Sequence, residues 1–173
     1  MAKVKKNYND LLSVLIVLIV TLAPSISLEA FGGDIQLNKY FNLEFIIIYF
    51  FSFNRFKYFR AISLFVLGII VDSLIGNYLG ISSIAFLILY KIAIYQNTIQ
   101  VRSIFISEWI AFGLAIFVVY AVELAMFYLT GVKTDIQAFV LNFIGSFLSY
   151  PIFWIILKYS FLRLERFSND KDE

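Results

Sequence analysis

Long apolar runs separated by short polar breaks dominate the chain, and this pattern predicts a bundle of membrane-crossing helices. A transmembrane helix needs about 20 mostly apolar residues to cross the hydrocarbon core of a bilayer, and its backbone must be hydrogen-bonded within the segment. Six segments approach or exceed this length, although the second, third and fourth are short for a complete span. The predicted helices are Leu11 to Leu28, Leu37 to Phe53, Tyr58 to Ile75, Leu79 to Tyr95, Ser103 to Leu129 and Ile136 to Leu157.

The basic residues predict the orientation of these segments. Lysine and arginine near helix ends stay on the cytoplasmic side of a membrane. Four regions contain all but two of the 14 basic residues: the N-terminus, the stretches at and beside the breaks after the second and fourth segments, and the C-terminal tail. The two exceptions are Lys39 and Lys133. Six spans with both termini in the cytoplasm place the four regions on one side, whereas five spans would not, so we predict six helices with an N-in, C-in topology.

The first segment has some features of a secretory signal peptide. It combines a basic start, an apolar core and small residues near Ser27 and Ala30, but its apolar run is longer than a signal peptide usually carries. We therefore expect an uncleaved first helix. With no linker or repeat visible, residues 1–173 are predicted to form a single polytopic transmembrane domain.

Composition narrows the class of protein further. The chain is 61% hydrophobic and 15% charged, whereas a soluble domain has about 45–50% apolar and about 25% charged residues. This excess of apolar residues argues against a soluble enzyme. The chain has no cysteine and no histidine, which excludes thiolate nucleophiles, histidine bases and Cys/His zinc sites. We expect no catalytic activity, no metal and no cofactor, and a net charge of +2 gives no reason to expect nucleic-acid binding.

Four carboxylic acids fall inside the predicted helices: Glu44, Asp72, Glu108 and Glu123. An ionisable residue at membrane depth costs at least about 2.5 kcal/mol on insertion, so each one is a functional hypothesis. A proton-coupled transporter could use such groups, but it would pair them across a cavity and would usually have more spans. We expect Glu44 and Glu108 to lie near a membrane interface and to contact water, and Asp72 to be the most informative of the four.

Asp72 stands in a glycine-rich pattern, Gly68-x-x-x-Asp72-x-x-x-Gly76, followed by Gly80. Four-residue spacing puts the first three on one helix face, and glycines allow a second backbone to approach closely. Gly76-Asn77 is a strong turn pair. The pattern predicts a tight hairpin between the third and fourth helices, with Asp72 one turn from its tip and accepting hydrogen bonds from the neighbouring backbone. Asp72 then either fixes the hairpin alone or has a partner-binding or switching role.

Two other helices carry small residues at helical spacing. The sixth has a small, polar face that ends before Pro151, consisting of Asn142, Gly145, Ser146 and Ser149. The fifth has the pairs Ala111 with Ala115 and Ala121 with Ala125. In lipid, such faces pack against other helices, and we expect internal bundle contacts from all of them.

The stretch from Arg60 to Tyr90 resembles the signature region of the rod shape-determining protein MreD family. That pattern is a basic residue, an apolar run, Gly-x-x-x-Asp, a short loop ending in Leu-Gly, and a serine-containing helix. In this chain it falls on Arg60, Gly68, Asp72, Gly76, Leu79, Gly80 and Ser82. The stretch covers less than a fifth of the chain, and elsewhere the likeness is one of size and predicted topology.

The resemblance implies a scaffold in the bacterial cytoplasmic membrane that performs no catalysis. The family acts with MreC, the actin-like MreB filaments, the glycosyltransferase RodA and a class B penicillin-binding protein. With them it organises peptidoglycan synthesis along the side wall and so sets rod shape. Helix-packing faces and a basic cytoplasmic side suit such a role.

The family's fold is thought to be similar to the S-components of energy-coupling factor transporters, which are also six-helix proteins. The resemblance therefore implies an alternative, a membrane subunit that binds a vitamin or another small solute. S-components carry Ala-x-x-x-Ala on the first helix to dock their transport partner. Here the apolar run of the first helix has only Ala23, and the alanine pairs lie on the fifth, which favours the scaffold over the transporter subunit.

Overall fold

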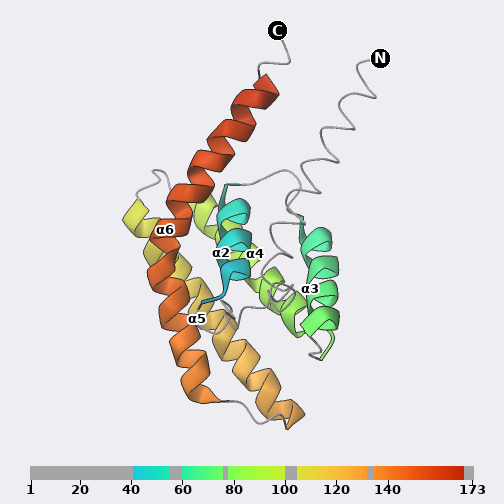
Figure 1. Ribbon diagram of the computed structural model, residues 1–173. Helices are drawn as coiled ribbons and strands as arrows, with labels where there is room; N and C mark the ends of the chain where they lie inside the picture. Colours follow the sequence, from blue (N-terminus) through green and yellow to red (C-terminus); the bar gives the residue numbers. More distant parts are fainter. Residues whose placement is uncertain (1–40, 55–59, 76–77, 100–104, 132–134, 170–173) are drawn as a thin grey trace, which may run out of the picture.

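Five helices make up the described part of the chain. The computed structural model describes residues 41–54, 60–75, 78–99, 105–131 and 135–169, and no strand occurs in these ranges. The helices are α2 (Leu43–Phe53), α3 (Ala61–Ile75), α4 (Ile81–Ile99), α5 (Phe105–Thr130) and α6 (Ile136–Asn169) (Figure 1). The predicted all-helical fold is confirmed for these residues. The predicted first helix, Leu11 to Leu28, lies outside them.

Two of these helices are long and apolar enough to cross a membrane. They are α5, with 26 residues, and the first 24 residues of α6, Ile136–Tyr159. α2 and α3 are apolar but have only 11 and 15 residues. At 1.5 Å per residue, α2 covers about 16 Å, roughly half of a hydrocarbon core of about 30 Å. By length and composition, the described residues therefore contain two candidate spans rather than the full predicted set.

The largest differences from the predicted boundaries are at the start of α2 and the end of α6. α2 begins at Leu43 instead of Leu37, because the side-chain oxygen of Asn42 accepts a hydrogen bond from the backbone N–H of Phe45 at 3.3 Å and caps the helix. α6 continues past Leu157 to Asn169. Apolar runs predict only the part of a helix that lipid can cover. The more polar end of α6 after Leu157 could therefore not be predicted from them.

α2 is the central helix of the described bundle. Every residue from Glu44 to Phe53 is buried, and α2 packs against α4 and α6 (Figure 1). The backbone N–H of Asn42 also donates to Ser146 Oγ at 2.7 Å. The beginning of α2 is therefore tied to the middle of α6, inside the bundle.

Aromatic rings fill the space around α2. The Phe112 ring of α5 stacks on the Tyr150 ring of α6 with centroids 4.2 Å apart. Tyr49 of α2 meets both rings edge-on, at 5.1 Å from Phe112 and 5.9 Å from Tyr150. Edge-to-face and offset ring pairs contribute beyond the area they bury, so this trio joins three helices at one point.

Neighbouring helices in sequence run in opposite directions and lie side by side from α3 onward (Figure 1). α3 packs chiefly against α4, α4 against α5 as well, and α5 against α6. α3 is therefore a peripheral helix, and one side of it faces outward.

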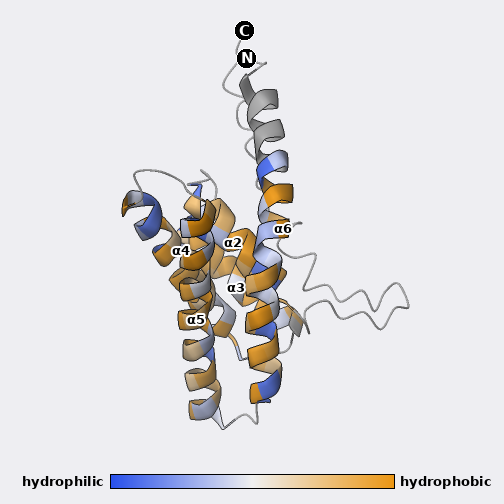
Figure 2. Ribbon diagram, turned by 90° about the vertical axis from the view of Figure 1, so that its left-hand side faces the viewer, coloured by the Kyte–Doolittle hydropathy of each residue, from blue (hydrophilic) through white to orange (hydrophobic). Residues whose placement is uncertain are grey.

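The outward faces of α5 and α6 are apolar. Figure 2 shows hydrophobic colouring over much of both helices, with paler and polar residues among it. The exposed side chains recur every three or four residues and include Ile106, Ile110, Leu114 and Phe117 on α5 and Leu141, Ile144, Leu148 and Ile152 on α6. Continuous apolar stripes of this kind are unusual on a protein surrounded by water and are typical of surfaces that contact lipid or another protein.

Candidate functional site

Asp72 forms a buried clamp between α3 and α4. Its side chain is 0% exposed. One carboxylate oxygen accepts a hydrogen bond from the backbone N–H of Gly80 at 2.6 Å, and the other accepts one from the N–H of Ser82 at 3.1 Å. Both donors lie at the N-terminus of α4, where N–H groups have no partner in the helix and a negative charge is stabilised. The hydrogen bonds that the sequence predicted are present. Asp72, a residue of α3, therefore caps the N-terminus of α4.

Gly68 brings the two helices into direct backbone contact one turn before Asp72. A Cβ atom on Gly68 would lie 2.4 Å from Ser83 Cα and 2.5 Å from Ser83 N. The hydroxyl of Ser83 donates to the carbonyl oxygen of Phe65 at 2.9 Å. The predicted close approach is confirmed, and Ser83 adds a hydrogen bond that the glycine pattern did not predict.

The tip of the hairpin combines a special backbone conformation with exposed side chains. Gly80 has φ +105°, which L residues rarely adopt, although a Cβ atom there would have free space. Tyr78 and Leu79 are 56% and 70% exposed. Gly76, the remaining glycine of the pattern, lies outside the described residues. The clamp therefore fixes a turn that presents two large apolar side chains outward.

A second buried carboxyl group joins α5 to α6. Glu108 is 3% exposed, and one of its oxygens accepts hydrogen bonds from the Tyr150 hydroxyl at 2.7 Å and from the Trp154 indole at 3.1 Å. The ammonium group of Lys158 lies 4.3 Å from the centre of the Trp154 ring. The carboxyl group of Glu108 therefore links the beginning of α5 to α6.

Trp109, beside Glu108, makes a contact that depends on Pro151. Proline has no N–H, so Pro151 cannot donate to the carbonyl oxygen of Phe147 four residues earlier. The Trp109 indole donates to that oxygen at 2.8 Å, and its ring stacks on the Phe147 ring with centroids 4.9 Å apart. Trp109 thereby replaces the helix hydrogen bond that Pro151 removes.

The predicted contribution of small residues to packing is correct for some positions. On α6, Ser146 is buried and receives the Asn42 hydrogen bond, while Asn142, Gly145 and Ser149 are half-buried. On α5, Ala111 and Ala115 are buried. The second pair, Ala121 and Ala125, is exposed, so the expectation of an internal contact there is wrong. The two pairs lie on different sides of α5, because their ten-residue separation is not a whole number of 3.6-residue turns.

The expectation that Glu44 and Glu108 contact water is also wrong. Glu44 is 4% exposed, because α2 starts within the bundle instead of at its surface. Glu108 is turned toward the aromatic donors of α6. Linear sequence could not distinguish these positions, since the partners of Glu108 are 42 and 46 residues away.

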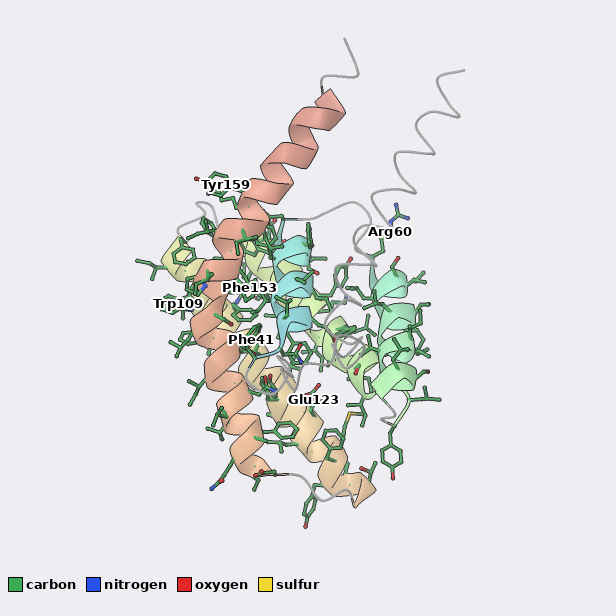
Figure 3. All side chains as sticks on the ribbon, viewed as in Figure 1. Phe41, Arg60, Trp109, Glu123, Phe153 and Tyr159 are labelled. Atoms are coloured by element: carbon green, nitrogen blue, oxygen red, sulfur yellow. The ribbon has the colours of Figure 1, made fainter. Side chains whose placement is uncertain are left out.

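Glu123 lies on α5 (Figure 3) and is half-buried. Glu44, Asp72 and Glu108 are buried, on α2, α3 and α5 respectively. No three acidic residues within the described ranges are close enough to hold one metal ion.

Comparison of the chain with protein-family models, curated proteins and solved structures finds no match. The structural features that bear on function are therefore those of the chain itself. They are two helices long and apolar enough to cross a membrane, a capped α3–α4 hairpin, and buried carboxyl groups between helices.

Proposed function

We propose that this protein is a multi-pass protein of the bacterial cytoplasmic membrane, with six transmembrane helices and both termini in the cytoplasm. Three observations support this topology. Two helices are long and apolar enough to span, the successive described helices alternate in direction (Figure 1), and Arg60 and Tyr159, which precedes the polar end of α6, lie at the same end of the bundle (Figure 3). Such an arrangement follows the positive-inside rule.

Within that membrane, we propose that the protein is a non-catalytic scaffold of the cell-wall elongation machinery that binds an MreC-like partner. RodA, a class B penicillin-binding protein and MreB are the further components expected in the same assembly. The proposal depends on the Asp72 clamp. Gly68, Asp72, Gly80 and Ser82, four positions of the block that resembles the MreD family, meet in one partly buried structure.

The clamp suits a protein-binding role because it makes a peripheral hairpin rigid. α3 packs chiefly against α4, so its other side is open and carries exposed apolar residues such as Ile62, Val66 and Leu74. The tip adds exposed Tyr78 and Leu79. Rigid surfaces lose less conformational entropy on association than mobile ones. We propose that the partner's transmembrane segment contacts this face of α3 and the tip.

The test combines cell shape with co-purification. Depletion of the protein should convert rods into spheres, and an MreC-like protein should co-purify from native membranes. Normal rods after a clean deletion would exclude the scaffold function. Asp72→Asn should disturb shape more than Glu44→Gln, which also neutralises a buried carboxyl, and equal tolerance of both would leave Asp72 without a special role.

A matched pair of surface variants separates partner binding from folding. Tyr78 and Leu79 at the tip have a counterpart in Tyr128 and Leu129, which are 86% and 84% exposed at the end of α5. Changing Tyr78 and Leu79 to serine should reduce recovery of the partner without lowering the amount of protein in the membrane. The same change at Tyr128 and Leu129 should leave recovery of the partner unchanged. Equal recovery of the partner by the two double variants would refute the proposed contact surface.

The acidic interior favours a second candidate, a solute-binding subunit similar to an S-component. Glu44, Asp72 and Glu108 are buried inside the bundle, which a pure scaffold does not require. Tight binding of a vitamin by the purified chain would support this candidate, and normal rod shape after deletion would support it over the scaffold.

A further inference from the structure

Basic residues gather at one end of the helix bundle. At this end α2 and α4 finish, α3 and α5 begin, and the apolar part of α6 ends at Tyr159 (Figure 1). Arg60 and Lys158 are exposed there. Among the described residues at the opposite end, the exposed charged residue is Asp135, an acid. The connections at the basic end and the last turns of α6 add further arginines and a lysine to the chain there: Arg55, Lys57, Arg102, Arg163 and Arg166.

The basic side chains described at this end are not neutralised by acidic ones. Neither Arg60 nor Lys158 forms an ion pair with a carboxylate of the described residues. Glu108, the buried carboxyl group at the beginning of α5, accepts its hydrogen bonds from Tyr150 and Trp154 instead. The positive charge at this end is therefore available to an anionic ligand.

Trp154 defines the position of the Lys158 ammonium group. The ammonium nitrogen lies 4.3 Å from the centre of the Trp154 ring, which is a cation–π contact. The ring is itself held, because its N–H donates to Glu108 at 3.1 Å and the Phe105 ring lies 4.7 Å from it. An ammonium group has three N–H donors, and the ring covers one side of it. An anion can therefore bind Lys158 from the exposed side.

Both tryptophans of the chain lie at this same end. The Phe105 ring, at the start of α5, contacts Trp109 and Trp154 with centroids 6.2 Å and 4.7 Å apart. Tyr159 follows Lys158 and is 73% exposed. Tryptophan and tyrosine are enriched at the level of lipid headgroups. The aromatic residues therefore indicate, independently of the charges, that Lys158 lies at headgroup level in a membrane.

Apolar side chains directly beside Lys158 favour a lipid over a soluble anion. Ile155 and Ile156, within one turn before it on α6, are 51% and 52% exposed. A phospholipid matches both features, because its phosphate meets the ammonium group while its acyl chains cover the isoleucines. Clusters of lysine and arginine at the cytoplasmic end of a transmembrane helix attract anionic lipids in this way.

We propose that this end of the bundle binds anionic phospholipid, and that the headgroup phosphate pairs with the Lys158 ammonium group beside Trp154. The other basic residues of this end add to the attraction. The proposal rests on the membrane placement proposed above, and it does not depend on the scaffold function.

The experiment measures quenching of tryptophan fluorescence by brominated lipids in vesicles that contain the full-length protein. Because both tryptophans lie at this end, their fluorescence reports on the lipid bound there. Two vesicle preparations contain phosphatidylglycerol and phosphatidylcholine in equal amounts, and a different one of the two lipids is brominated in each. Quenching should be stronger when phosphatidylglycerol is brominated. Sodium chloride should reduce the difference, since salt screens exposed charges.

Three variants test the role of Lys158. Lys158→Gln should lower the binding constant of phosphatidylglycerol relative to phosphatidylcholine by about fivefold, because one basic residue near an anionic membrane surface contributes about 1 kcal/mol. Lys158→Arg keeps the charge and should keep the preference. Lys133→Gln removes the same charge from the connection between α5 and α6, at the opposite end of the bundle, and should leave the preference unchanged.

The possible failures are distinguishable. The proposal is overturned if the two brominated lipids quench the wild-type protein equally, or if Lys158→Gln keeps the wild-type preference. It is also overturned if soluble glycerol phosphate abolishes the preference more effectively than sodium chloride at the same ionic strength, because the site would then take a free phosphate. Absence of quenching by either lipid would refute the membrane placement on which the proposal rests.

Discussion

The contact between Trp109 and the Phe147 carbonyl allows a quantitative test of how α5 and α6 are joined. Trp109→Phe retains an aromatic ring against Phe147 but removes the indole N–H. The Phe147 oxygen then has no donor, because Pro151 cannot supply one. Leaving a buried acceptor unsatisfied costs about 1–3 kcal/mol, and hydrogen bonds between membrane helices contribute about 0.6–2 kcal/mol. We therefore expect Trp109→Phe to lower the free energy of unfolding by about 1–2 kcal/mol.

A double-mutant cycle isolates this contribution from the difference in ring size. Pro151→Ala restores a backbone N–H at position 151, which can donate to the Phe147 oxygen as in any α-helix. In that background, Trp109→Phe should cost about 0.5 kcal/mol or less beyond the change in packing, because the oxygen keeps a partner. Unfolding free energies of the four proteins in detergent micelles give the coupling directly. An equal cost of Trp109→Phe in both backgrounds would refute the argument that Trp109 replaces the hydrogen bond lost at Pro151.

Three further predictions use the same unfolding measurement. Gly68→Ala should lower stability by about 1–3 kcal/mol, because its Cβ would overlap the Ser83 backbone at 2.4 Å; wild-type stability would show that the helices are not in such close contact. Gly80→Ala should cost about 1–2 kcal/mol from backbone strain alone, since the added Cβ meets no atom within 4 Å, and a neutral result would argue against the positive φ. Glu108→Ala should cost about 2 kcal/mol or more by leaving its two donors on α6 without an acceptor, whereas Glu108→Gln keeps a carbonyl oxygen and should cost about 1 kcal/mol or less. Equal losses from the two Glu108 variants would contradict the acceptor role.

Local patterns predicted the α3–α4 hairpin because its parts are close in sequence. Asp72 and its two donors are separated by only eight and ten residues. Helical spacing and glycine positions therefore determine which atoms meet. The same locality explains why the helical class and most helix boundaries could be predicted from apolar runs.

Contacts between distant segments could not be predicted in this way. The cap of α2 bonds to Ser146, 104 residues further along the chain, and this tie lies at the beginning of the helix in which Glu44 is buried. The side of α5 that faces inward is determined by how α2, α4 and α6 surround it, so Ala115 is buried while Ala121 is exposed. In a chain that is apolar on nearly every face, the hydrophobic pattern no longer distinguishes the inside from the outside.

The sequence alone therefore determined the helical class, the composition suited to lipid and the Asp72 hairpin, since these follow from residue type and short-range spacing. Only the tertiary structure decided that α2 is the central helix, that Glu108 joins α5 to α6 and that Glu44 is buried. The physical reason is that these features depend on packing between helices, and packing is set by the shapes of side chains that the sequence separates by tens of residues.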